Sequence, residues 1–183
     1  MQSLALRAAA ALLCALGVAG CASSGDNELA VDLLPYPATD GTHVETPAQP
    51  MECVPYARAR SGLALYGDAG TWWDKAEGRY AKRQAPQIGA VIVLTRYAGP
   101  GRGHVGVVTA LVSAREIRLD HANWLGDGAI YIDDPVADVS PENDWSEVRV
   151  WNPRTAQWGR KTYFVEGFIG PDRIDDFDRV ASE

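Results

Sequence analysis

The feature that most constrains this chain is that only one of its three cysteines, Cys53, lies in the part expected to fold. Cys14 lies inside an apolar leader, and Cys21 directly follows that leader. An intramolecular disulfide is therefore excluded, and a hydrophobic core has to hold the domain together. A leftover cysteine in an exported chain indicates intermolecular pairing or a reactive thiol, whereas a buried cysteine of the core is the ordinary alternative.

The leader, residues 1–20, predicts export. It carries one positive charge, Arg7, followed by an uncharged apolar stretch that is too short for an ordinary membrane-spanning helix. It ends in Val18-Ala19-Gly20-Cys21, which resembles the lipobox of bacterial lipoproteins and implies lipidation of Cys21. An ordinary signal peptide whose cleavage site meets a cysteine is the alternative. No aspartate directly follows Cys21, which by the same resemblance implies the periplasmic face of the outer membrane in the cell envelope.

The remaining part of the chain, about 160 residues, is long enough for one domain with a core. Residues 21–50 are rich in Pro, Asp, Thr and Glu and predict a tether behind the lipidated N-terminus. Residues 51–170 form the predicted domain, and residues 171–183 form an acidic tail. The formal net charge of −7 and the lack of a basic run argue against nucleic acid as a partner.

Cys53 is predicted to stand at the N-terminus of a helix. From Cys53 to Ala64 small or apolar residues recur at helical spacing, Pro55 is acceptable only in a first turn, and Gly62 is suited to end the helix. At a helix start the free N–H groups and the helix dipole stabilise a thiolate, so the pKa of Cys53 is expected to be lowered. The charge of Glu52 opposes this shift unless its side chain points to water.

Later segments predict strands. Ala90–Thr95 is a run of mostly β-branched residues, and His104–Ala110 is a strand that opens with its histidine. Arg115–Asn123 alternates cleanly, so that His121 and Asn123 share the face of the apolar residues while Asp120 lies on the other face. Two polar groups on an inward face need partners there.

Together these residues indicate an activated nucleophile. A thiolate needs a histidine that accepts its proton, and that histidine needs a polar group that orients it. Cys53, His104, and His121 or Asn123 fit these roles, whereas His43 falls in the tether. Zinc also binds cysteine and histidine, but short-spaced ligand pairs such as C-x-x-C are absent, so we expect no metal and no cofactor.

Over about residues 51–124 the chain resembles a CHAP domain, the cysteine, histidine-dependent amidohydrolase/peptidase family. The motifs that carry the resemblance stand in the family's order: ECVPYA at 52–57, GTWW at 70–73, Pro86 with GAV at 89–91, GHVGVV at 103–108, and Asn123-Trp124. The resemblance implies a papain-like α+β fold, in which an N-terminal helix carrying the cysteine packs on an antiparallel β-sheet. It also implies cleavage of amide or peptide bonds in bacterial peptidoglycan.

Carried over position by position, Cys53 is the nucleophile and His104 the general base and then acid. Many CHAP domains show Glu-x-Asn-Trp where this chain has His121-Ala122-Asn123-Trp124, so His121 stands in the place of the glutamate. A neutral imidazole can still orient His104, as in the Cys-His-His arrangement of related NlpC-type peptidases, but it withholds a negative charge. Asn123 can orient His104 instead or help to bind the oxyanion, together with the backbone N–H of Cys53.

Trp72, Trp73 and Trp124 are the candidate substrate contacts. Thr71-Trp72-Trp73-Asp74 has the form of a capping box with Thr71 as the cap, and it predicts a second short helix. Two adjacent tryptophans cannot share one helix face, so one is expected to pack inward and the other to line a groove. Plain packing of both is the alternative.

The sequence therefore predicts a peptidoglycan hydrolase that forms an acyl-enzyme on Cys53. An N-acetylmuramoyl-L-alanine amidase and an endopeptidase within the peptide part both agree with the motifs. The alternative is a non-catalytic, lipid-anchored scaffold that binds peptidoglycan or a protein. The predicted partners are peptidoglycan and, through Cys21, the membrane, and a regulatory partner is left open.

Overall fold

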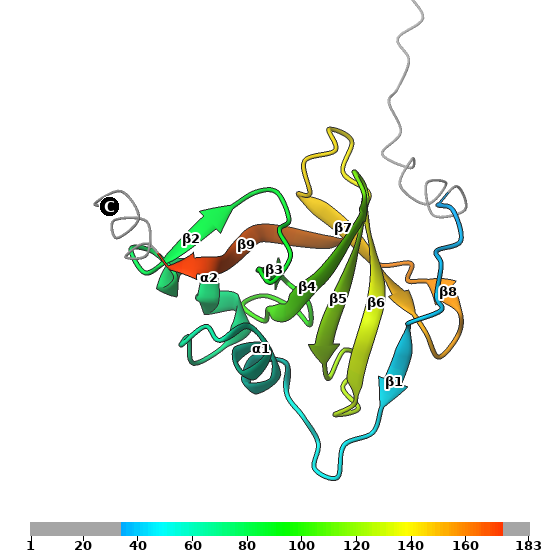
Figure 1. The fold of residues 1–183 in the computed structure, drawn as a ribbon, viewed down its shortest axis with the longest axis horizontal. Helices are drawn as coiled ribbons and strands as arrows, with labels where there is room; N and C mark the ends of the chain where they lie inside the picture. Colours follow the sequence, from blue (N-terminus) through cyan, green and yellow to red (C-terminus); the bar gives the residue numbers. More distant parts are fainter. Residues whose placement is uncertain (1–33, 174–183) are drawn as a thin grey trace, which may run out of the picture.

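The computed structural model describes residues 34–173 (Figure 1). The predicted signal peptide, Cys21, and parts of the predicted tether and acidic tail lie outside the described residues. The elements are, in chain order, β1 (His43–Glu45), α1 (Cys53–Ser61), the 3-10 helix η1 (Ala69–Thr71), α2 (Trp72–Lys75), β2 (Tyr80–Arg83), β3 (Val91–Thr95), β4 (His104–Ser113), β5 (Glu116–Ala122), β6 (Ile130–Asp138), β7 (Glu147–Asn152), β8 (Gln157–Trp158) and β9 (Tyr163–Arg173). Among the described residues, none of the helices has the length and apolar character needed to span a bilayer.

Within residues 34–173, six strands close into an antiparallel barrel. They follow one another in the order β6, β5, β4, β3, β9 and β7, and β7 then pairs back with β6 through Val150 opposite Val136. The shorter strands extend this barrel, because β1 pairs with β6, β8 with β7, and β2 with β9. Helix α1 lies outside the barrel, where it packs against β4 and β5 (Figure 1).

The expected papain-like α+β fold is wrong. Among the described residues, helix is confined to short segments, whereas the strands form a closed barrel in place of a sheet covered by a helix. The closure depends on two long strands that change partners along their length: β6 pairs with β1 near its start and with β7 near its end, and β9 pairs with β7, β3 and β2 in turn. Register shifts in the β5–β6 and β3–β9 pairs bend these strands, so that the sheet curls back on itself.

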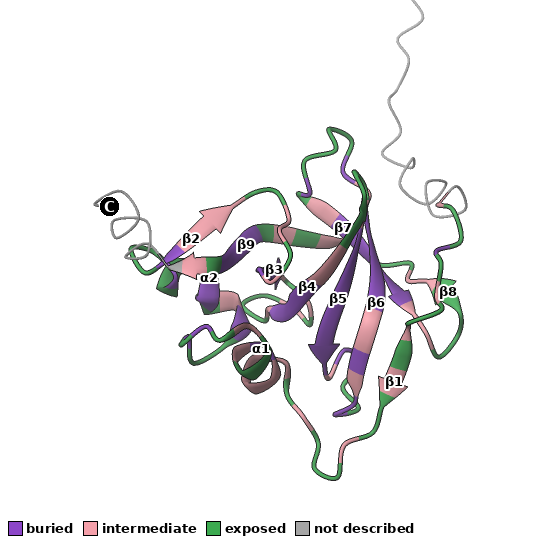
Figure 2. Ribbon diagram, viewed as in Figure 1, coloured by how far each residue is buried: buried purple, intermediate pink, exposed green. Residues whose placement is uncertain are grey.

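Strand β3 shows why the predicted strand Ala90–Thr95 lacks an alternation of apolar and polar residues. Ile92 and Leu94 pack in the barrel interior, whereas Val91 and Val93 pack in a second cluster beneath the helices. Because both faces of the strand are covered, both need apolar side chains. Figure 2 shows the same burial along nearly the whole of β5.

The two helices begin where the sequence predicted. Cys53 is the first residue of α1, and Gly62 ends this helix in the left-handed conformation, with its N–H donating to the carbonyl of Arg58. Helix α2 follows Thr71, but the Thr71 hydroxyl donates to the carbonyl of Asp68 and does not cap the helix. The predicted position of Cys53 at a helix start is therefore confirmed. The predicted capping box is wrong, because the Thr71 side chain makes no hydrogen bond that caps α2.

Leu94→Ala is expected to lower the free energy of unfolding by about 2–5 kcal/mol, because Leu94 is fully buried in the barrel interior. The matched control is Leu111→Ala on the neighbouring strand β4, where the side chain is 50% exposed and the loss should stay below about 1 kcal/mol. Urea unfolding measures both values. Equal losses would contradict a closed, packed interior.

Candidate active site

Cys53 lies half-buried at the first residue of α1, in the wall of a cavity of about 400 Å³. Glu52, Asp68 and the loop Gly101–Gly103, which precedes β4, also line this cavity. The backbone of Val105 on β4 lies near the Cys53 thiol and lowers its pKa. Helix α1 therefore brings the thiol to the start of β4, near Val105, which follows His104 in the chain.

Burial raises the pKa of the Cys53 thiol above its ordinary value, which contradicts the lowering expected from the helix start. Removing a thiolate from water is costly, and this cost is the largest influence on the pKa of Cys53. Backbone hydrogen bonds with Val105 and Val54 act in the opposite direction, while the charge of Glu52 adds to the increase in pKa. The resting thiol is therefore protonated at neutral pH.

His104 forms a buried pair with His121. It lies opposite Leu94 of the barrel interior, is 1% exposed, and its Nε2 lies 2.9 Å from Nδ1 of His121 on the neighbouring strand. Gly106 stands directly opposite His121, where an added Cβ would come within 3.1 Å of the His121 Cβ, so glycine leaves the space that this imidazole needs. Of the two candidates for the third position, His121 and Asn123, the structure brings His121 to His104.

Behind His121 lies a carboxylate that the sequence reasoning missed, that of Asp134 on β6. His121 Nε2 lies 3.0 Å from Asp134 Oδ2, and both side chains are completely buried. A register shift between Leu119 and His121 in the β5–β6 pair accompanies this contact. The sequence contains two adjacent aspartates in this strand, Asp133 and Asp134, and simple alternation does not reveal which one meets His121.

Aromatic rings enclose the two imidazoles. The Trp124 ring lies 4.9 Å from His104 and 5.2 Å from His121 between centroids, while Tyr97 lies 4.9 Å from His104 and Tyr131 lies 5.4 Å from His121. Burial in this apolar setting, together with the neighbouring His121, holds the pKa of His104 well below its ordinary value. His104 is therefore a neutral imidazole at physiological pH.

The hydrogen-bond pattern determines which nitrogen of His104 is free for chemistry. Because Nε2 is engaged with His121, Nδ1 is the nitrogen of His104 that is left free to accept a proton. Asp120 takes no part in this chain of contacts, since its Oδ2 pairs with Arg60 Nε at 3.0 Å on the side of α1. This agrees with the prediction that Asp120 faces away from the histidines.

Asn123 supports the site from outside the histidine pair. Its Nδ2 donates to Glu52 Oε2 at 2.8 Å, and its Oδ1 accepts from the N–H of Gly128 at 2.8 Å. The N–H of Met51 donates to the carbonyl of the same glycine at 3.0 Å. These bonds tie the chain just ahead of Cys53 to the end of β5, and they occupy both ends of the Asn123 amide.

The three predicted tryptophan contacts lie in different environments. Trp72 is fully buried beneath the helices, and Trp124 is 5% exposed against the histidines, so both provide packing in this structure. Trp73 is half-buried, packs over Gly167 of β9, and has the Lys82 Nζ 4.3 Å from its ring centroid.

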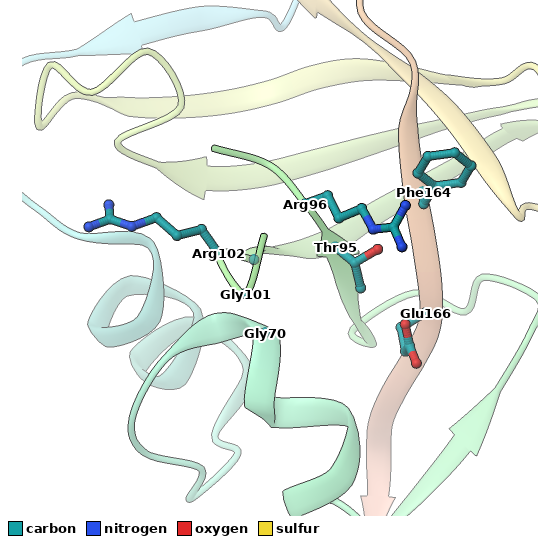
Figure 3. A pocket seen from close by; sticks show the side chains of 8 residues that line it. Gly70, Thr95, Arg96, Gly101, Arg102, Phe164 and Glu166 are labelled. Carbon is teal, nitrogen blue, oxygen red and sulfur yellow. The ribbon is translucent and has the colours of Figure 1, made fainter. Parts of the chain in front are cut away.

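A second cavity, of about 550 Å³, shares the loop Gly101–Gly103 with the cavity at Cys53 (Figure 3). Arg96 follows β3, and Phe164 and Glu166 come from β9. Figure 3 shows Arg96 extended toward Phe164, and Arg102 directed to the opposite side, toward α1. The loop that leads into His104 thus separates two hollows of mixed charge.

The described residues contain no group of three or more histidine, cysteine, aspartate or glutamate side chains arranged to hold a metal ion.

The CHAP domain family model matches residues 44–123, which include Cys53, His104, His121 and Asn123. The match confirms the resemblance predicted from the motifs. CHAP domains are generally cysteine- and histidine-dependent amidohydrolases or peptidases, so the match indicates a function of the peptidoglycan-hydrolase type. It begins within β1, inside the segment predicted as a tether, and ends before Asp134. No curated protein and no solved structure matches the chain.

Alkylation of Cys53 by iodoacetamide is expected to be slow at mildly acidic pH and to rise at a higher pH than that of a small model thiol, because burial raises the pKa of Cys53. Mass spectrometry of the time course measures the rate, with a small model thiol as the control. A fast rate that is already constant at neutral pH would contradict this expectation, since it would reveal a resting thiolate.

Proposed function

We propose that this chain is a peptidoglycan hydrolase in which the Cys53 thiol attacks an amide or peptide carbonyl. The observation that carries the proposal is the buried 2.9 Å hydrogen bond between His104 and His121 at the start of β4, next to the helix start that bears Cys53. The family match supports the general class of reaction, and this geometry supports the roles of the residues.

The proposed reaction begins from neutral groups. Burial raises the pKa of Cys53 and lowers that of His104, so a resting ion pair is disfavoured and His104 accepts the proton as the sulfur attacks. The oxyanion is expected to lie at the start of α1, where backbone N–H groups have no intrahelical partner. His104 then gives the proton to the leaving amine. Water hydrolyses the C–S bond of the thioester, so that the carboxylic acid leaves and Cys53 regains its proton.

The proposed substrate is the peptide part of peptidoglycan. The cavity at Cys53 presents the acidic Glu52 and Asp68 and the basic Arg102, so it offers contacts to both charges of a peptide. The proposal covers an endopeptidase within the peptide and an N-acetylmuramoyl-L-alanine amidase at its junction with the glycan, because both reactions need the same acyl transfer.

We also propose that the chain acts at the periplasmic face of the outer membrane, anchored by a lipid on Cys21. This rests on the lipobox-like Val18-Ala19-Gly20-Cys21 and on the leader that precedes it. A lipid anchor would hold the domain beside the peptidoglycan layer that it is proposed to cut.

A non-catalytic scaffold is the second candidate, and one observation favours it. The raised pKa of Cys53 is what a cysteine that only packs would show. The His104–His121 pair favours the hydrolase over the scaffold, because burying two imidazoles costs stability. A surface that only binds peptidoglycan gains nothing from such a pair.

Digestion of purified peptidoglycan tests the proposal. The wild-type protein is expected to release fragments whose masses identify the bond, while Cys53→Ala and His104→Ala should lower the rate by about 1000-fold or more. His43→Ala changes an exposed histidine in β1 and should leave the rate within about twofold.

Release of nothing by the wild-type protein, while all variants sediment with the cell wall, would reject the hydrolase and favour the scaffold. Equal release by the wild type and by Cys53→Ala would reject the assignment of the nucleophile.

A further inference from the structure

Asp134 completes a row of buried groups that begins at His104 and continues through His121. His104 Nε2 meets His121 Nδ1 at 2.9 Å, and His121 Nε2 meets Asp134 Oδ2 at 3.0 Å. All three side chains lie inside the barrel with at most 1% of their surface exposed. Asp134 lies outside the residues that the family model matches, so nothing in that match assigns it a role.

Hydrogen-bond rules link the protons of this row. An ionised carboxylate can only accept, so Asp134 requires a hydrogen on Nε2 of His121. Nδ1 of His121 is then an acceptor, which requires a hydrogen on Nε2 of His104. His104 Nδ1 is left with a free lone pair, and this is the nitrogen that accepts the thiol proton in the proposed reaction.

We propose that Asp134 is a positioning residue that sets the tautomers of His121 and His104 and supplies the negative charge that a histidine in the third position lacks. This inference rests on the proposed hydrolase function. His121 stands where a glutamate stands in many members of the family, and Asp134 places a carboxylate one side chain further inward. The charge thereby faces the imidazolium that forms on His104 during attack, through the ring of His121.

The surroundings of Asp134 support a role beyond packing. Its Oδ1 is buried without a hydrogen-bond partner among the described residues, which a carboxylate kept only for stability would not be expected to show. The pKa of Asp134 is raised above its ordinary value by burial, and the hydrogen bond with His121 and the charge of Arg118 oppose this increase. If Asp134 were neutral and donated to His121, every hydrogen bond of the row would run in the opposite direction. His104 would then carry its hydrogen on Nδ1, and this nitrogen could not accept a proton.

Nuclear magnetic resonance of the full chain with isotope-labelled histidine tests the tautomers directly. In the wild-type protein at neutral pH, Nε2 is expected to carry the hydrogen in both His104 and His121. In Asp134→Asn, His121 is expected to lose this strict preference, because an amide can donate as well as accept. Asp138→Asn, which changes another buried carboxylate of β6 that bonds to Ser140, is the matched control and should leave both rings unchanged.

Peptidoglycan turnover provides the second measurement. Asp134→Asn is expected to lower kcat by about 10- to 1000-fold with KM within about twofold, because the change acts through His104 and does not touch substrate. Asp138→Asn should keep kcat within about twofold even if its thermal stability falls as far as that of Asp134→Asn.

Two results would overturn the proposal. One is a hydrogen on Nδ1 of His104 in the wild-type protein. This measurement uses the wild-type protein alone, so it does not depend on whether a variant folds. The other is an Asp134→Asn protein with wild-type tautomers and wild-type kcat. The tautomers are read without turnover, so a protein with the expected tautomers and no hydrolysis would reject the hydrolase function while leaving the arrangement of protons intact.

Discussion

The buried hydrogen bond between His104 and His121 is the interaction on which the rest of this site depends. Burying an imidazole is costly unless its nitrogens find partners, and here each ring supplies one partner for the other. The closed barrel makes the pairing possible, since adjacent strands present the two rings and Gly106 leaves room for them. Asp134 from the next strand then satisfies the remaining nitrogen of His121. The thiol comes from outside the barrel, on helix α1, which packs against β4.

Burial determines the electrostatics of this arrangement more than the helix dipole does. The pKa of the Cys53 thiol is raised and that of His104 is lowered, so both groups rest in their neutral forms. A neutral pair needs a base that is already oriented when substrate arrives, because no preformed thiolate is available. The row of hydrogen bonds behind His104 supplies that orientation, and the aromatic rings around it exclude water. The low polarity that makes the resting site neutral also strengthens each of its hydrogen bonds.

Local sequence patterns predicted the parts of this structure that depend on neighbours along the chain. The helix start at Cys53, the strand that opens with His104 and the inward direction of His121 all follow from spacing and turn residues. Closure of the barrel was not predictable, because it depends on β6 and β9 changing partners over long sequence separations. Asp134 was missed for the same reason, since a register shift between two strands decides which side chain meets His121. The direction of the Cys53 pKa shift was wrong because burial is set by packing against β4, which a helix pattern alone does not show.

The central claim is that Cys53 forms a covalent acyl-enzyme with His104 as its base. Its most direct test is mass spectrometry of the Cys53 peptide after an excess of protein is mixed with a peptidoglycan peptide and quenched with acid within a single turnover. The account predicts a thioester adduct on Cys53 whose mass equals the substrate less its leaving amine, and it predicts that His104→Ala forms this adduct far more slowly. Cleavage of the peptide at full rate with no adduct on Cys53 at any time would contradict it.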